Sequence, residues 1–296
     1  MDYLDLIDAV QSVADGVLFG ATYALLGIGF TLIFGVMHKI NLSFAAASIG
    51  AAYVSLLILA GFKAPAILVF LTAALAGGVI GALVYLVGFK FIPLANPLAT
   101  LMSTVGLLLL IDEIIVHSTD GVPLNYPALF SDVIIPAGPF NIRGDLVFVF
   151  VLGCVCMAVL LTLLYRTKLG LATRAVSQQP VASQLCGISI TRVNLLTFVI
   201  TGMVGGIAGA MTGAAIGMLS PLLSLPLTVK GLIVTVIGGL GSIPGAIIAG
   251  LVVGGLENFF QFFRGVTERD LYIMLLLFAF LVFKPGGLFA TSAGRD

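Results

Sequence analysis

A glycine-rich run at residues 236–250, VIGGLGSIPGAIIAG, is the kind of stretch that can cradle a phosphate with backbone N–H groups. A dinucleotide fingerprint needs G-x-G-x-x-G, and a Walker loop needs G-K followed by Ser or Thr. Counted from Gly239 and Gly241, the third glycine position is Pro244, and no G-K-S or G-K-T tripeptide occurs. The run instead predicts a tight break between two apolar helices, with Gly241 and Ser242 ending one helix and Pro244 in the first turn of the next.

The sequence gives little support for catalysis or metal binding by this chain. The two histidines, His38 and His117, are expected on opposite sides of a membrane, so they cannot share a metal ion. The cysteines Cys154, Cys156 and Cys186 form no C-x-x-C pattern, which predicts unpaired, buried thiols. G-x-S-x-G and H-E-x-x-H motifs are absent from the sequence. We expect no catalytic residue, no metal site and no cofactor bound by this chain.

Intramembrane acids and bases would indicate an ion relay. Asp112, Glu113 and Glu257 all fall near the predicted outer ends of apolar segments, where water is available. We therefore expect no charged side chain at the membrane midplane, which disfavours a proton or sodium relay.

The amino-acid composition indicates whether the chain lies mainly in water or in lipid. Of 296 residues, 60% are hydrophobic and 9% charged, and the mean hydropathy is +1.23, whereas soluble domains carry about 25% charged residues. Thirteen basic and thirteen acidic residues cancel, so charge gives no sign of a nucleic-acid partner. The chain is predicted to be all-α, a polytopic helical membrane protein with one membrane domain over residues 1–296.

Apolar windows predict nine crossings, with eight or ten left open. The windows near 228–241 and 270–284 are shorter than the ~20 residues needed to span a bilayer, so they could be re-entrant or broken. The N-terminus, MDYLDLIDAVQSVADG, lacks the positive region of a signal peptide and predicts a short amphipathic segment before the first span. The nine windows are 15–36, 42–60, 65–89, 95–116, 145–165, 193–218, 228–241, 244–262 and 270–284.

Basic residues predict the orientation. With the N-terminus outside and the C-terminus cytoplasmic, eight of the thirteen lysines and arginines lie inside, as the positive-inside rule requires. Residues 117–144, which contain four prolines, become an external loop with room for short strands. Residues 166–192, the densest polar stretch, become a cytoplasmic loop with a short helix near 171–186. In a chain whose other cytoplasmic loops are short, such a loop is expected to bind a partner.

Small and hydroxylated residues predict how the helices pack and what lines a path. A four-residue spacing places glycines along one helix face. This spacing fits equally well a tight contact between helices and a surface along which helices slide. Most hydroxyls at membrane depth bond to their own helix, and a few are expected to line a path. The predicted packing glycines are Gly205, Gly209, Gly213, Gly217, Gly241 and Gly245. The predicted path residues are Asn41, Ser43, Thr100, Thr104, Thr201 and Thr235.

Several blocks together resemble one transporter family. ALLGIGFTLIFGVMHKINLSFAAASIGAAYV near the N-terminus and VTVIGGLGSIPGAIIAGLVVGGLE near the C-terminus resemble LivH-type permease subunits of branched-chain amino acid ABC importers. PLATLMSTVGLLLLI (97–111), RAVSQQPVASQLCGISITRVNLLTFVI (174–200) and KPGGLF (284–289) fit in the same order. The resemblance covers nearly the whole chain.

The resemblance implies a set of partners in a bacterial or archaeal cytoplasmic membrane. These are a second related permease, two cytoplasmic ATPases and an extracytoplasmic substrate-binding protein. ATP and Mg would be bound by the ATPases, which accounts for the missing Walker motif. Residues 171–187 would then be the coupling segment that docks on an ATPase. The residues expected to couple there are Arg174, Gln178, Gln179, Leu185 and Gly187.

The resemblance also implies ATP-driven alternating access for amino acids, with one departure. Family members commonly show Asn-Phe-Ala-His-Gly at the second span, whereas here Leu42, Ser43, Phe44 and Ala45 follow Asn41. The cargo therefore stays open among branched-chain amino acids, urea, amides and other small solutes. The alternative functions are a self-contained channel or secondary transporter for a small neutral solute, and a structural membrane scaffold.

Overall fold

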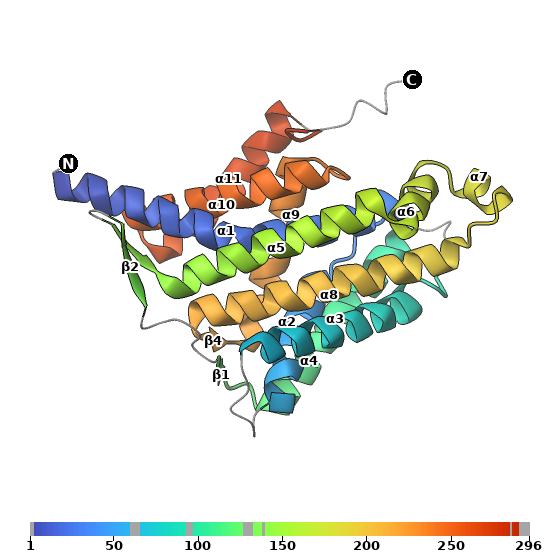
Figure 1. The fold of residues 1–296 in the computed structure, drawn as a ribbon, viewed down its shortest axis with the longest axis horizontal. Helices are drawn as coiled ribbons and strands as arrows, with labels where there is room; N and C mark the ends of the chain where they lie inside the picture. The colour runs from blue at the N-terminus through green and yellow to red at the C-terminus, as the bar shows by residue number, and fades with distance from the viewer. Residues whose placement is uncertain are drawn as a thin grey trace.

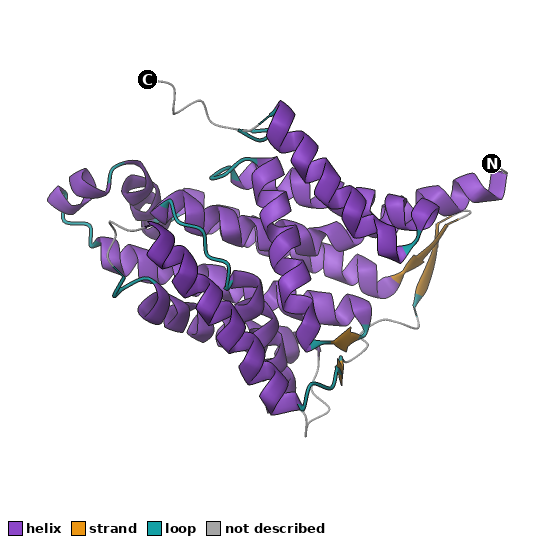
Figure 2. Cartoon of the chain, turned by 180° about the vertical axis from the view of Figure 1, so that it is seen from behind, coloured by secondary structure: helices purple, strands orange, loops and turns teal. Residues whose placement is uncertain are grey.

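The computed structural model describes residues 3–59, 66–92, 97–126, 133–137, 140–284 and 286–289. Across these residues the fold is almost entirely helical, with four short strands at the edge of the bundle (Figure 1, Figure 2). The elements in chain order are α1 (Tyr3–Met37), α2 (Phe44–Leu59), α3 (Ala66–Gly88), α4 (Pro97–Thr119), β1 (Leu124–Asn125), β2 (Ile134–Ala137), β3 (Phe140–Arg143), α5 (Gly144–Arg166), α6 (Lys168–Gln178), α7 (Pro180–Leu185), α8 (Ile190–Ile216), β4 (Met218–Leu219), the 3-10 helix η1 (Pro221–Leu223), α9 (Ser224–Gly238), α10 (Ile243–Arg264) and α11 (Val266–Phe283).

Each of the nine predicted apolar windows corresponds to one long helix, which confirms the polytopic all-α prediction. Among the described residues, seven helical segments are long and apolar enough to cross a membrane, with η1 and α9 forming one of them. The apolar helix α2 is shorter, at 16 residues. The helix α11 carries Glu268, Arg269 and Asp270 in its first turns.

The N-terminal segment is part of the first spanning helix rather than a separate element. α1 runs unbroken for 35 residues, about 52 Å at 1.5 Å per residue. Its first turns project from one side of the bundle (Figure 1). The cysteines are free, as predicted, but Cys154 and Cys186 are exposed, so the expectation of buried thiols is wrong.

Two helix pairs form the centre of the molecule, α1 with α10 and α3 with α8. In both pairs glycines of one helix face the backbone of the other. Gly16 and Gly20 of α1 lie against Gly254 and Gly250 of α10, so the two helices run antiparallel. In the second pair, Gly77 and Gly81 of α3 lie against Gly202 and Gly206 of α8. A side chain at any of these positions would push the backbones apart, because no flexible side chain separates them.

The predicted packing glycines fall into two groups. Gly205 and Gly209 face α2, Gly213 faces the ring of Tyr126, and Gly245 faces the backbone of Gly238. Gly217 and Gly241 instead lie at helix ends with φ of +81° and +88°, and a Cβ there would touch nothing within 4 Å. At these two positions the left-handed backbone, rather than helix contact, accounts for glycine, so they are not packing residues.

The bundle has two distinct ends. The strand end carries residues 120–126, 133–137, 140–143 and 217–223. There β1 pairs with β4 through Leu124 and Leu219, and β2 pairs with β3 as a hairpin. The α6–α7 end carries residues 167–189 and 239–242, and lies on the opposite side of the molecule (Figure 1). Successive long helices alternate between the two ends, so the loops predicted to be external and those predicted to be cytoplasmic lie at opposite ends of the bundle.

Candidate functional site

The polar segment at 166–192 forms two short helices rather than the single helix predicted near 171–186. Thr167 caps α6 by accepting a hydrogen bond from the Gly170 N–H, at 3.2 Å between N and Oγ1. α6 ends before Gln179, whose backbone is extended at φ −146° and ψ 93°. Pro180 follows, and a residue before proline is driven out of the helical region. The chain therefore turns at Gln179 before α7 begins.

The predicted coupling residues all lie on the exposed side of this helix pair. Buried Gly170, Thr173 and Val176 hold α6 against the bundle, while Arg174, Gln178, Gln179, Leu185 and Gly187 are exposed. Leu185 is 86% exposed at the end of α7. Gly187, two residues after the end of α7, adopts a left-handed backbone conformation with a φ of +82°. Leu171 and Val181 of the same two helices are also exposed, at 62% and 73%, and exposed apolar side chains gathered on one segment are typical of a surface that meets another protein.

A cavity of about 740 Å³ lies behind α6. The C-terminal turns of α1, the end of α5, α6 and the turn between α9 and α10 surround it. The run VIGGLGSIPGAIIAG thus contributes Leu240 to Pro244 to its wall. The residues that line it are Thr31, Leu32, Phe34, Gly35, Val36, His38, Leu164, Tyr165, Thr173, Arg174, Ser177, Gln178, Leu240, Gly241, Ser242, Ile243, Pro244 and Phe289.

The break in that run differs from the prediction by a few residues. α9 ends at Gly238, and Gly239 adopts a φ of +100°. Ser242 does not close α9 but caps α10, because its Oγ accepts from the Gly245 N–H at 3.3 Å. Pro244 lies in the first turn of α10, as predicted.

The predicted path residues are all buried. Thr104, Thr201 and Thr235 donate to carbonyls of their own helices, at 2.9, 2.9 and 2.7 Å. These hydroxyls therefore need no other partner. Asn41 and Thr201 border a cavity of about 10 Å³, room for about one water molecule.

The remaining predicted path residues, Asn41, Ser43 and Thr100, make polar contacts near the first turns of α2 and α4. Asn41 Oδ1 accepts hydrogen bonds from the N–H and the hydroxyl of Ser43, at 3.2 and 2.8 Å. The Lys39 ammonium donates to the Thr100 hydroxyl at 2.7 Å. Partial burial lowers the pKa of Lys39 from its ordinary value. Two separate polar pairs, Lys39 with Thr100 and Asn41 with Ser43, therefore lie at the α6–α7 end.

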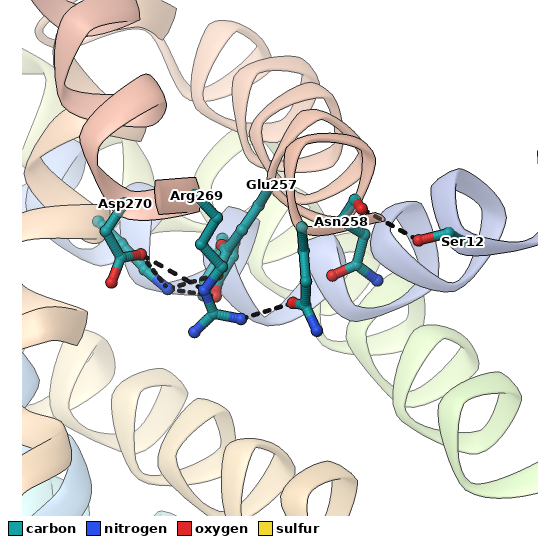
Figure 3. A network of polar contacts seen from close by, with 8 residues as sticks. Ser12, Glu257, Asn258, Arg269 and Asp270 are labelled. Carbon is teal, nitrogen blue, oxygen red and sulfur yellow. Dashed lines mark hydrogen bonds and ion pairs between the residues drawn. The ribbon is translucent and has the colours of Figure 1, made fainter. Parts of the chain in front are cut away.

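A charge cluster, which the sequence analysis did not predict, connects α1, α9, α10 and α11 (Figure 3). Its Lys230 and Glu257 are buried, whereas the Asp270 side chain is 51% exposed. The Lys230 ammonium lies 2.6 Å from Glu257 Oε1 and 3.2 Å from the Tyr23 hydroxyl. Arg269 Nε lies 3.4 Å from the same Glu257 oxygen, and Asp270 Oδ1 lies 3.6 Å from both cations. Two positive and two negative side chains therefore balance within the protein.

This cluster corrects the expectation that Glu257 has access to water. Glu257 is 3% and Lys230 8% exposed. The signal available in the sequence was Lys230 itself, a lone cation within the apolar stretch 221–238, since an isolated charge in an apolar helix needs a partner. Asp112 also finds a partner, because its Oδ2 accepts from the Ser224 hydroxyl at 2.7 Å.

Metal-ligating side chains do not gather in the part of the chain that the structure describes. No group of three or more His, Cys, Asp or Glu side chains lies close enough to hold an ion there. His38 lies at the C-terminal end of α1 and His117 in the last turn of α4, at opposite ends of the bundle.

Comparison with known proteins gives a consistent result over nearly the whole chain. Residues 12–283 match the family described as branched-chain amino acid transport system / permease component. The chain is 27% identical over 292 residues to the high-affinity branched-chain amino acid transport system permease protein BraD of Pseudomonas aeruginosa, covering 94% of this chain and 95% of that one. It is 26% identical over 291 residues to LivH of Escherichia coli K12, with 94% of each covered.

A solved structure shares the fold. An inward-facing conformation of a metal-chelate type ABC transporter superposes with a TM-score of 0.53 at 19% identity, covering 93% of this chain and 85% of that one. At this identity the match concerns the fold alone.

Proposed function

Because the chain belongs to the family of permease components of branched-chain amino acid transport systems, we propose that it is one permease subunit of an ABC importer that moves branched-chain amino acids inward. As a permease component it has no catalytic role of its own. A second related permease, two cytoplasmic ATPases that bind ATP and Mg, and an extracytoplasmic binding protein complete the transporter. The Asn41 to Ala45 departure keeps other small amino acids and amides among the candidate cargoes.

One observation carries the coupling part of this proposal. In a bundle whose outer surface is mostly apolar, α6 and α7 present a polar face with three exposed apolar side chains, Leu171, Val181 and Leu185, at 62%, 73% and 86% exposure. Exposed apolar anchors surrounded by polar residues are typical of protein interfaces. We assign this face to the ATPase and propose that its closure pushes α6 and α7. The movement would pass through α5 and α8, which contact α6, and open the path outward.

Basic residues support a cytoplasmic position for the α6–α7 end. Seven described lysines and arginines lie there, namely Lys39, Lys90, Arg166, Lys168, Arg174, Arg192 and Lys284. At the other end, Arg143, Lys230 and Arg269 are paired with carboxylates, and Arg264 carries no such pairing among the described residues. Lysines and arginines near the ends of spanning segments are enriched on the cytoplasmic side, and among the described residues the α6–α7 end carries seven of them against four at the strand end. We therefore propose an external N-terminus and a cytoplasmic C-terminus. Lys63 and Arg295 of the predicted distribution lie outside the described residues.

Co-purification tests the coupling face. Leu185→Asp places a charge at the apolar tip, and we expect it to reduce recovery of the ATPase about tenfold or more, the loss typical of an interface anchor. Leu222→Asp is the matched control, because Leu222 is 82% exposed at the strand end. Recovery of the ATPase at native levels with Leu185→Asp would refute the assignment of α6 and α7.

The alternative function is a secondary transporter. The sequence argued against it from the expected absence of charged side chains at the membrane midplane, whereas the argument from the structure is charge balance. Lys230 and Glu257 are buried in the bundle, but together with Arg269 and the exposed Asp270 they form a cluster whose charges neutralise one another. A carboxylate that relays protons must be free to change its charge, and here each carboxylate lies beside two cations. The cluster therefore suits a fixed structural contact between helices.

A further inference from the structure

The segment at 286–289 is bonded to the end of α9 rather than loose at the surface of the bundle. The Leu288 N–H donates to the Ile237 carbonyl at 2.8 Å, and the Phe289 N–H donates to the Gly238 carbonyl at 3.3 Å. The two carbonyls that precede these in α9 accept from the Gly239 N–H. The last four carbonyls of a helix have no donor within the helix itself, so the 286–289 segment completes the cap of α9.

Close backbone contact also fixes this segment. Gly287 has a φ of +81°, and a Cβ added there would lie 2.5 Å from the Gly239 Cα. Glycine therefore allows the segment to approach the turn between α9 and α10 this closely. The side chains that follow, Leu288 and Phe289, are held in place by these contacts although they are 40% and 44% exposed. Exposed apolar side chains on a fixed segment form a surface that a partner can cover.

The 286–289 segment borders the cavity of about 740 Å³ behind α6. Phe289 lines this cavity, and so does Leu240 of the turn between α9 and α10, which is 45% exposed. Arg174 and Gln178 of α6 line it too, and both belong to the face that we assign to the ATPase. The cavity therefore joins that face to the 286–289 segment in one continuous surface. A protein that covers α6 and α7 also meets the mouth of the cavity.

Charge indicates the chemistry of the partner. No Asp or Glu is among the residues that line the cavity. Residues 160–194, which include α6 and α7, contain no Asp or Glu and four basic residues, namely Arg166, Lys168, Arg174 and Arg192. Complementary charges guide the pairing of protein surfaces. This surface therefore fits a partner that presents apolar side chains beside carboxylates.

We propose that the 286–289 segment, Leu240 and the cavity form a second contact for the ATPase. Phe289 and Leu240 pack against apolar side chains of the ATPase, and Arg174 pairs with one of its carboxylates. This inference rests on the proposed function for the identity of the partner and for the side of the membrane. The ATPase then contacts the end of α9 as well as α6 and α7, so its closure moves α9 and α10 directly and not only through α5 and α8.

Photocross-linking in the assembled transporter tests the second contact. Phe289→p-benzoylphenylalanine should form a covalent adduct with the ATPase under ultraviolet light, because the ATPase lies against this side chain. Leu185→p-benzoylphenylalanine reports the first contact, and Leu222→p-benzoylphenylalanine, exposed at the strand end, should give no ATPase adduct.

The pattern of adducts distinguishes this inference from the proposed function. An ATPase adduct from position 185 without one from position 289 would overturn the inference and leave the proposed function standing. Cross-linking of position 289 to lipid or to a second copy of this chain, in place of the ATPase, would do the same. ATPase adducts from neither position would overturn the inference and the assignment of α6 and α7 together.

Binding of the purified ATPase to the permease pair in lipid nanodiscs measures the strength of the contact. Phe289→Ala should weaken the affinity about fivefold or more, the loss typical of an interface side chain. Phe278→Ala is the matched control, because Phe278 is 68% exposed within α11 and does not line the cavity. Gly287→Leu keeps Phe289 but separates the segment from Gly239, and it should also weaken binding. Equal affinities of the Phe289 and Phe278 variants would contradict the second contact.

Discussion

Glu257 is a buried carboxylate whose charge depends on two neighbouring cations for compensation. Its carboxylate lies against Lys230 and Arg269 and is almost fully shielded from solvent. Three helices contribute to these contacts, since Lys230 lies on α9, Glu257 on α10 and Arg269 on α11. Removing one partner of a buried pair leaves the others uncompensated, which costs more than the pair contributes when intact.

Glu257→Gln should therefore destabilise the folded chain by about 3 kcal/mol. The measurement is the melting temperature of the purified protein in detergent. Glu268→Gln is the control, because Glu268 is exposed on the same hairpin, and it should change stability by about 0.5 kcal/mol or less. The double variant Lys230→Met with Glu257→Gln restores charge balance and should recover part of the loss. Equal melting temperatures for the Glu257 variant and the native chain would contradict the structural role of the cluster.

Sequence reasoning found residues by type but not their partners. It identified Asn41 and Thr201 as buried polar groups, yet their bonds to Ser43 and to the Thr197 carbonyl depend on local geometry. It placed Glu257 near water because the residue lies close to a helix end, whereas α9 and α11 cover that end. Distance along one helix predicts depth in the membrane, but burial depends on the neighbouring helices.

At the level of elements, glycines set the distance between helices. The α2–α8 contact places Gly209 directly on the Ser48 carbonyl, and the α3–α8 contact places Gly202 on the Gly77 carbonyl. Such backbone contact replaces the packing that side chains provide elsewhere.

Gly209→Leu should separate α2 from α8 and destabilise the fold by at least about 2 kcal/mol, as overpacking does. Gly106→Ala is the control, since Gly106 is also helical but a Cβ there meets nothing within 4 Å. That change should be neutral or stabilise by up to about 1 kcal/mol, because alanine favours the helix. Thermal unfolding measures both. If the Gly209 variant unfolded at the native temperature, close helix contact would not account for these glycines.

Long apolar windows identified the spanning helices because length and hydropathy alone determine whether a helix can cross a bilayer. The break between α6 and α7 was missed although Pro180 indicates it, since the residue before a proline is restricted to extended backbone. Gly217 and Gly241 were predicted to pack from their spacing, and only the positive φ of each assigns it to a helix end. Periodicity cannot distinguish a glycine on a helix face from one that ends the helix.

For the whole molecule, the segregation of loops to two ends predicts which surfaces face each side of the membrane. Cys186 is exposed on the α6–α7 end, and Leu222 is exposed on the strand end. In cells that express the chain without the ATPases, and in a Cys154→Ala, Cys156→Ala background, a membrane-impermeant maleimide should label Cys186 only after the cells are permeabilised. With Cys186 also replaced by Ala, Leu222→Cys should be labelled in intact cells. The reverse pattern would invert the proposed orientation.

The cavity behind α6 shows why the whole fold was needed to find an open space between distant segments of the chain. Its wall combines Thr31, Arg174 and Gly241, which come from three distant parts of the chain. The sequence suggested a role for Arg174 in a loop and for Gly241 in a break, but it did not single out Thr31. Only the antiparallel contact of α1 with α10 brings them to one place.

The most direct test of the central claim is leucine uptake into proteoliposomes that contain the permease pair, with the ATPases, the binding protein and ATP supplied on their proper sides. The account predicts accumulation that requires ATP and both the ATPases and the binding protein, and that falls about tenfold or more with Leu185→Asp but not with Leu222→Asp. Accumulation by this chain alone, without ATPases, would contradict the account and identify a self-contained transporter.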